Sequence, residues 1–271
     1  MSATTSRWID LDGAENVRDL GGLPTVDGRV VRPHRLIRSD SLQTLSPADV
    51  RYLVDELEVR TIADLRTGVE VELEGHGPMT REPSVDIRHL SLFPEVGDNT
   101  DAVALDDEDA PVVLPWQTRD RTEAREERRR GAPGIYLSYL DDRADSIVAA
   151  LRLIAHSDGA TVVHCAAGKD RTGVVVAMAL AEVGVDPEAI VDDYAQSAER
   201  TAATIHRLAG RRTYATDLLS EVDIDKHKPR AVTMQRMLEA IDDVHGGVPA
   251  WLRANGWTAA DAAALRAKLL A

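Results

Sequence analysis

The order of apolar and polar residues in the first third of the chain predicts strands and a helix in alternation. Residues 35–38 are predicted to form a strand. Residues 46–49 read Ser-Pro-Ala-Asp, a helix start with a serine cap and a proline in the first turn. Apolar residues then recur at i, i+3, i+4 and i+7, from Val50 to Leu57, as on one buried helix face. A strand at residues 59–65 follows, and this alternation favours a mainly parallel sheet covered by helices.

The middle of the chain holds one more predicted strand, at residues 87–92, before the pattern changes. Residues 94–115 are loop-like, and residues 116–130 are highly charged and favour an exposed helix. Because the stretch of about 94–131 is inserted between two core elements, a lid near the functional site is a second interpretation of it.

Helices are predicted to dominate the C-terminal half. Residues 135–156 are predicted to form one long helix, and a short buried strand at 161–163 and an apolar helix at 174–180 follow. The remaining predicted helices are 187–208, 230–244, 249–254 and a last one capped by Thr258. We therefore expect an α/β fold, with a central, mainly parallel sheet flanked by helices and a helical C-terminal half. The expected organisation is a single domain over residues 1–271.

Composition permits such a core and excludes several classes of function. Hydrophobic residues make up 44% of the 271 residues, which is ample for one large domain. The net charge of −14 argues against binding nucleic acid by bulk attraction. No stretch approaches the roughly 20 apolar residues of a membrane span, so no stable membrane insertion is expected. A single cysteine and the lack of an apolar N-terminal run indicate a reducing, cytoplasmic location.

The candidate chemistry is concentrated in residues 162–173, which read Val-Val-His-Cys-Ala-Ala-Gly-Lys-Asp-Arg-Thr-Gly. A strand, a tight loop at Gly168 and a helix start make an anion site, because loop N–H groups and the helix dipole converge there. Arg171 can bind two phosphate oxygens with its planar guanidinium. The positive surroundings favour the thiolate form of Cys165, to which Thr172 can donate its hydroxyl.

The motif His164-Cys165-x5-Arg171-Thr172 resembles the phosphate-binding loop of cysteine-dependent protein tyrosine phosphatases. The string Gly-Lys-Asp-Arg-Thr-Gly is similar to that of an atypical bacterial and fungal branch of these enzymes. Other segments that agree are 16–22, 38–39, 64–66 and 193–194, and the glycines at 246, 247 and 256. The residues expected to bind the substrate phosphate are Ala166, Ala167, Gly168, Lys169, Asp170 and Arg171. We expect neither a cofactor nor a metal.

Each residue of the loop has a predicted role. Cys165 attacks phosphorus in line and forms a phosphocysteine, while Arg171 and the loop amides hold the equatorial oxygens. His164 is predicted to order the loop rather than to transfer protons. Lys169 either stays solvated or supplies a second cation for polyanionic substrates such as phosphoinositides.

Two carboxylates compete for the role of general acid. Asp64 stands at the carboxyl end of its predicted strand, the edge at which Cys165 also emerges if the two strands are parallel neighbours. Asp170 lies inside the loop, where flanking cations favour its ionised form. Asp64 is therefore ranked first, and its alternative role is a helix cap or a partner of Arg66. The alternative for Asp170 is a salt bridge that orients the loop, and the resemblance marks both carboxylates as functional.

The predicted function is a phosphomonoester hydrolase, a protein tyrosine phosphatase whose partners are phosphorylated proteins and whose loop binds phosphate or another oxyanion. A phosphoinositide or dual-specificity phosphatase is the rival within enzymes, and Lys169 is the residue that favours it. An inactive phosphopeptide-binding module is the rival from another class, against which Cys165 and Arg171 argue. Activity on phosphotyrosine, phosphoserine and phosphoinositide substrates discriminates these alternatives.

Overall fold

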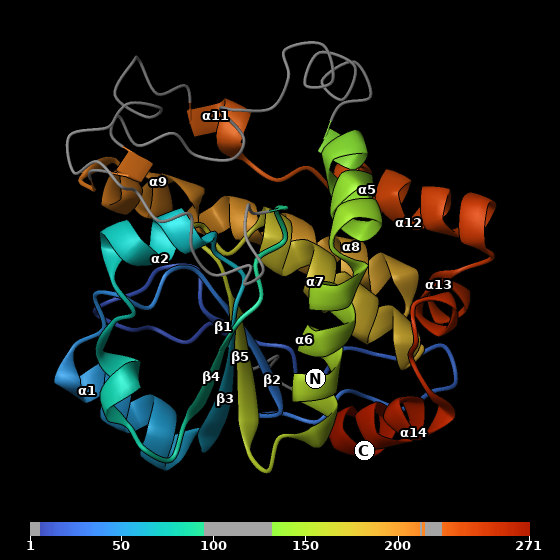
Figure 1. The fold of residues 1–271 in the computed structure, drawn as a ribbon, viewed down its shortest axis with the longest axis horizontal. Coiled ribbons are helices and arrows are strands. Elements are labelled where there is room, and N and C mark those ends of the chain that lie inside the picture. Colours follow the sequence, from blue (N-terminus) through green and yellow to red (C-terminus); the bar gives the residue numbers. More distant parts are fainter. Residues whose placement is uncertain (1–5, 95–131, 212, 215–223) are drawn as a thin grey trace.

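The computed structural model describes residues 6–94, 132–211, 213–214 and 224–271. A five-stranded sheet in the order β1-β2-β5-β3-β4 lies at its centre (Figure 1). Strands β2, β5, β3 and β4 run parallel, and β1 pairs antiparallel with β2 at the edge. The strands are β1 (Arg18–Asp19), β2 (Leu36–Ser39), β3 (Val59–Asp64), β4 (Asp86–His89) and β5 (Ala160–His164). The predicted mainly parallel sheet is thus confirmed.

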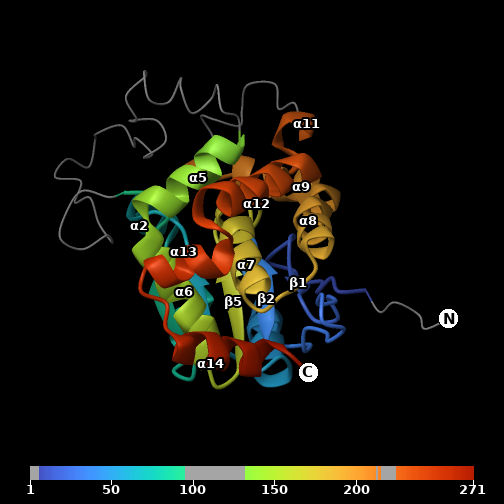
Figure 2. The same cartoon turned by 90° about the vertical axis from the view of Figure 1, so that its right-hand side faces the viewer.

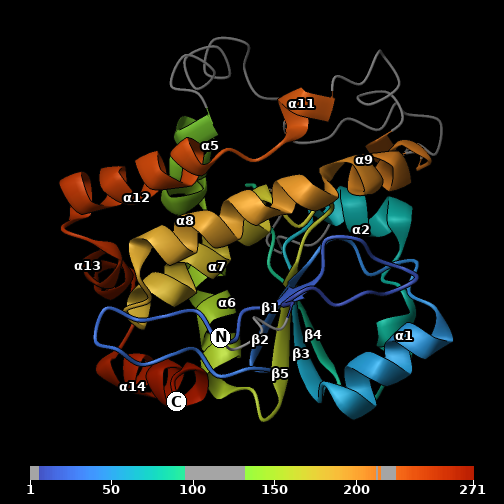
Figure 3. The same ribbon diagram turned by 180° about the vertical axis from the view of Figure 1, so that it is seen from behind.

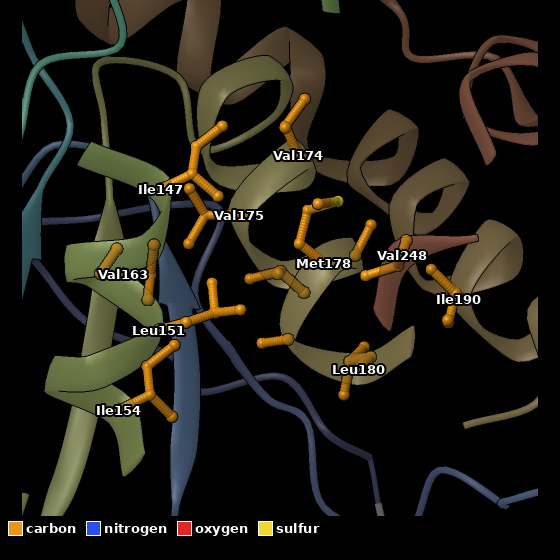
Figure 4. Close-up of a cluster of buried hydrophobic side chains, with 14 of the residues drawn as sticks. Ile147, Leu151, Ile154, Val163, Val174, Val175, Met178, Leu180, Ile190 and Val248 are labelled. Carbon is orange, nitrogen blue, oxygen red and sulfur yellow. The ribbon is translucent and has the colours of Figure 1, made fainter. Parts of the chain in front are cut away.

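Side chains alternate between the two faces of the central strands, so that each face has its own hydrophobic core. Val163 of β5 belongs to the larger core, and its neighbour Val162 belongs to the smaller one. In the larger core, Val163 lies close to Ile147 and Leu151 of α6 (Ala144–His156) (Figure 4). This burial on both faces explains why the strand reads as a continuous apolar run.

Helices cover both faces of the sheet. Helices α6 and α7 pack on one face and α1 lies on the other (Figure 1), with α13 and α14 outside α6 and α7 (Figure 2). Helices α8 and α9 cross above the upper edge of the sheet in Figure 3. The helices are α1 (Pro47–Arg51), α2 (Gly68–Glu74), α5 (Ala132–Asp142), α6 (Ala144–His156), α7 (Asp170–Glu182), α8 (Pro187–Gln196), α9 (Thr201–Ala209), α11 (Ile224–His227), α12 (Ala231–His245), α13 (Val248–Ala254) and α14 (Ala259–Leu269).

Local signals placed several helix ends correctly. The Ser46 hydroxyl accepts from the N–H of Asp49, and the Asp49 carboxylate accepts from the N–H of Ser46, which completes a capping box. Thr258 caps α14 in the same way. The predicted helix after Ser46 continues beyond α1 as a π-helical turn, Tyr52–Glu56, that the periodicity did not predict.

The prediction of one long helix over residues 135–156 is wrong. The chain breaks at Arg143, whose φ of −136° and ψ of 41° separate α5 from α6. The Arg143 guanidinium donates to the carbonyl oxygen of Phe93 at 2.9 Å, a contact with a distant segment. The predicted helix 187–208 likewise divides into α8, a 3₁₀ turn (Ser197–Arg200) and α9.

The predicted lid lies almost entirely outside the described residues. Residues 95–131, which include the predicted helix 116–130, belong to that part of the chain. Among the described helices, none combines the length and the hydrophobicity that a membrane crossing requires.

Candidate active site

The loop between β5 and α7 begins where the central strand ends. Cys165 directly follows β5 and has 2% of its surface exposed, and α7 begins five residues later at Asp170. Gly168 has a φ of 68°, which favours glycine. A Cβ atom at this position would also lie 2.5 Å from the carbonyl oxygen of Ser39. Glycine is therefore required at residue 168 for two independent reasons.

The peptide groups of the loop have their carbonyl oxygens bound by the surrounding protein. The N–H of Ser41 donates to the carbonyl of Ala166 at 3.0 Å, and Asn16 donates to that of Ala167 at 3.0 Å. Arg38 donates to the carbonyl of Gly168 at 2.8 Å. In a trans peptide the N–H points opposite to the C=O, so the following N–H groups point away from these donors. No described residue accepts a hydrogen bond from the backbone N–H groups of Ala167, Gly168 or Lys169. These three N–H groups are thus available to an anion.

Arg171 is anchored by a carboxylate that sequence reasoning missed. Its guanidinium makes a two-point contact with Glu70 of α2, with N–O distances of 2.5 and 2.9 Å. Burial alone would lower the pKa of Arg171, but the Glu70 charge outweighs it and places the pKa well above its usual value. The Tyr214 hydroxyl donates to Glu70 at 2.5 Å, and the Phe93 ring lies 5.7 Å from the guanidinium carbon. The sequence signal at Glu70 is the capping box Thr67-x-x-Glu70, which marks a helix start and does not show that Glu70 binds Arg171.

Asp64 lies where the parallel pairing predicted, because β3 and β5 are neighbours and Asp64 is in register with His164. Its carboxylate is bound by Arg66 at two points, with N–O distances of 2.6 and 2.9 Å, and its side chain is 6% exposed. Burial alone would raise the pKa of Asp64, but His164 and the Arg66 guanidinium lower it well below its usual range. This arrangement corresponds to the alternative interpretation, a partner of Arg66.

Asp170 is bound by two tyrosines in series and by the neighbouring lysine. The Tyr136 hydroxyl donates to its Oδ1, and the Tyr194 hydroxyl lies 2.6 Å from that of Tyr136. Lys169 Nζ lies 3.3 Å from Oδ2, and 37% of the Asp170 side chain is exposed. Burial would raise the pKa of Asp170, but Lys169 and the Tyr136 hydroxyl lower it below its usual value. Asp170 is thus the more accessible of the two candidate acids.

Three predicted residues of the loop remain, namely Lys169, His164 and Thr172. Lys169 Nζ donates to the carbonyl of His227 at 2.8 Å, so its charge is engaged by α11. His164 Nδ1 lies 3.3 Å from the carbonyl of Cys165, and burial lowers the pKa of His164. The buried Thr172 hydroxyl has no hydrogen-bond partner in the described part of the chain, so its predicted bond to the thiolate is not formed here.

Helix α9 packs on the loop beside Cys165. Ile205 and Leu208 of α9 form a small hydrophobic cluster with Ala166 and Tyr214. The residues that follow α9 bind α2, because Arg211 pairs with Glu74 at 2.9 Å and Tyr214 donates to Glu70. Sequence reasoning missed this contact, since an apolar helix stripe does not reveal which surface it covers.

Comparisons with known proteins agree with this geometry. The model of a family described as the tyrosine phosphatase family matches residues 9–271. The triple specificity protein phosphatase PtpB of Mycobacterium tuberculosis is 29% identical over 289 residues, covering 96% of this chain and 98% of its own length. A tyrosine-protein phosphatase of Nostoc commune is 49% identical over 47 residues, which cover 17% of this chain and 16% of that protein.

Proposed function

The chain belongs to the tyrosine phosphatase family and is a phosphatase, and from this premise we propose that it hydrolyses phosphotyrosine in proteins through a phosphocysteine on Cys165. The observation that carries the proposal is the loop after β5, where three N–H groups without a described acceptor follow the cysteine. Arg171, held by Glu70, supplies the cation that such a site requires. The family match over residues 9–271 supports one phosphatase domain.

The reaction has two displacements at phosphorus. The Cys165 thiolate attacks, an S–P bond forms, the P–O bond to the tyrosine breaks, and the leaving oxygen takes the electron pair and a proton. Water then attacks phosphorus, the S–P bond breaks, and phosphate leaves as the thiolate is restored. The loop amides and Arg171 stabilise the equatorial oxygens in both steps. Because the thiolate is needed, we propose a reducing compartment, the cytoplasm, as the site of action.

We assign the general acid to Asp170 in preference to Asp64. Both oxygens of Asp64 are bound by Arg66, and its side chain is 6% exposed, so it is poorly placed to meet a leaving oxygen. Asp170 is 37% exposed and belongs to the loop itself. Its Oδ1 accepts from the Tyr136 hydroxyl and its Oδ2 lies 3.3 Å from Lys169 Nζ, so the preference for Asp170 rests on its exposure. This reverses the order that the sequence favoured.

Leaving groups of different basicity test the assignment. Asp170→Asn should slow hydrolysis of phenyl phosphate by about a hundredfold or more, and that of an activated aryl phosphate much less, because only the poor leaving group needs the proton. Asp64→Asn should affect both substrates equally. If Asp64→Asn is instead the variant that discriminates between them, the acid is Asp64.

The nucleophile is tested separately. Cys165→Ser should abolish turnover and still bind phosphate or vanadate, since the amides and Arg171 remain. Arg171→Lys should lose both, because a point charge cannot replace the planar guanidinium. Normal turnover by Cys165→Ser would refute the phosphocysteine mechanism.

A phosphoinositide substrate is the second candidate, and Lys169 is the residue that favours it. In this structure the lysine is bound by the His227 carbonyl and Asp170, and its side chain is 19% exposed. A second phosphate would have to displace both partners. We therefore place phosphotyrosine first and test the order with matched phosphotyrosine peptides and phosphoinositides.

A further inference from the structure

The Asn16 side chain connects the N-terminal segment to the phosphate loop. Its Nδ2 donates to the carbonyls of Ala167 and Gly168, at 3.0 and 3.2 Å, and its Oδ1 accepts from Arg18 at 2.8 Å. Arginine is only a donor, so Oδ1 must face Arg18 and Nδ2 must face the loop. The residue is 2% exposed. Neither end of the buried side-chain amide can therefore exchange its protein partner for water.

Arg38 of β2 also supports the carbonyl of Gly168, from another direction. Its Nη2 lies 2.8 Å from the carbonyl of Gly168 and 3.4 Å from that of Lys169. Its Nη1 donates to Asp193 at 2.7 Å, and Asp193 also binds Arg18 at 3.0 Å. The buried carboxylate of Asp193 thus holds Arg38, which donates to the loop, and Arg18, which orients Asn16.

The supported peptides flank the one glycine that the sequence has between Cys165 and Arg171. They lie on either side of Gly168, whose φ of 68° and missing Cβ allow a peptide flip at low steric cost. A flip would turn a carbonyl oxygen toward the bound phosphate in place of an N–H group, and attraction would become repulsion. The two donors of this network act at the two peptides where that exchange is easiest.

We propose that Asn16 is a positioning residue for phosphate binding, which holds the carbonyls of Ala167 and Gly168 outward so that the N–H groups of Gly168 and Lys169 face the anion. The inference rests on the proposed function, since it assumes that phosphate binds in this loop. The backbone of Asn16 is itself fixed, because its N–H donates to Asp40 at 3.0 Å. Asn16 therefore acts as a rigid connection and does not touch the substrate.

Two substitutions separate the loss of the donor from a change of charge. Asn16→Asp keeps the acceptor for Arg18 but has no donor for the loop, and Asn16→Ala removes the donor without adding a charge. Both should weaken vanadate and phosphate inhibition by about tenfold to a hundredfold and lower kcat/KM similarly. The ratio of rates on phenyl and activated aryl phosphates should stay unchanged, because proton transfer is intact.

The matched control is Asn255→Asp, since the Nδ2 of Asn255 also donates to a carbonyl, that of Trp251 at 2.9 Å, but at the C-cap of α13, away from the loop. It should leave oxyanion affinity unchanged. If folded Asn16→Ala binds vanadate as tightly as the wild type, the positioning role is wrong and the proposed function still stands. If only Asn16→Asp weakens binding, added charge is the cause and the inference is also wrong. Failure of the proposed function would look different: the wild-type protein itself would neither bind vanadate nor turn over.

Discussion

Asp40 is a buried carboxylate behind the phosphate loop, and its titration should be visible in the stability of the protein. It follows β2 and is 1% exposed. Its oxygens accept from the N–H groups of Glu15 and Asn16, at 3.0 to 3.2 Å. Burial raises the pKa of Asp40 from 3.8 to about 6, because these hydrogen bonds only partly replace lost hydration.

The direction and size of the effect follow from proton binding. Between about pH 4 and about pH 6 the folded protein keeps a proton on Asp40 that the unfolded chain releases, so this group's contribution to stability falls as pH rises. The difference of about two pH units corresponds to about 3 kcal/mol of unfolding free energy. Above about pH 6 this contribution of Asp40 to stability is fully lost.

Asp40→Asn removes the charge and keeps an oxygen that can accept from both N–H groups. The unfolding free energy of the variant minus that of the wild type should therefore increase by about 3 kcal/mol as the pH is raised from about 4 to about 7. Urea unfolding of both proteins at several pH values measures this difference, and Asp55→Asn, at an exposed position, controls for net charge. A difference that is constant with pH, or that changes in the opposite direction, would refute the reasoning.

Three further outcomes follow from contacts around the loop. Glu70→Gln should lower the free energy of unfolding by about 3 kcal/mol in urea, because it leaves the buried charge of Arg171 unpaired; unchanged stability would contradict this. Tyr136→Phe should raise the pKa of Asp170 and move the basic limb of the phenyl phosphate pH–rate profile to higher pH; an unmoved limb would exclude Asp170 as the acid. If Lys169 serves polyanionic substrates, Lys169→Ala should reduce activity on phosphoinositides far more than on phosphotyrosine peptides; equal losses would mean that the lysine only supports the loop, as its bonds to His227 and Asp170 suggest.

The sequence by itself determined the local frame of the site. An apolar run, a glycine and a helix start bracket Cys165, and each is a short-range signal that burial and backbone sterics enforce directly. The strand–helix alternation predicted a parallel sheet, and parallel neighbours bring Asp64 beside His164 at one edge. These features depend on periodicity and on residues close together in the chain.

Tertiary structure decided which polar side chains of the site bind each other across long distances in the sequence. Glu70 meets Arg171 across 101 residues, and Asn16 meets Gly168 across 152. Such pairs depend on how helices and strands pack, whereas periodicity reports only which side of an element is buried. The sequence does not distinguish a charged side chain that is solvated from one that is paired with a distant residue. Our proposal of Asp170 in place of Asp64 has the same origin, because it rests on side-chain exposure and partners, and neither is encoded locally.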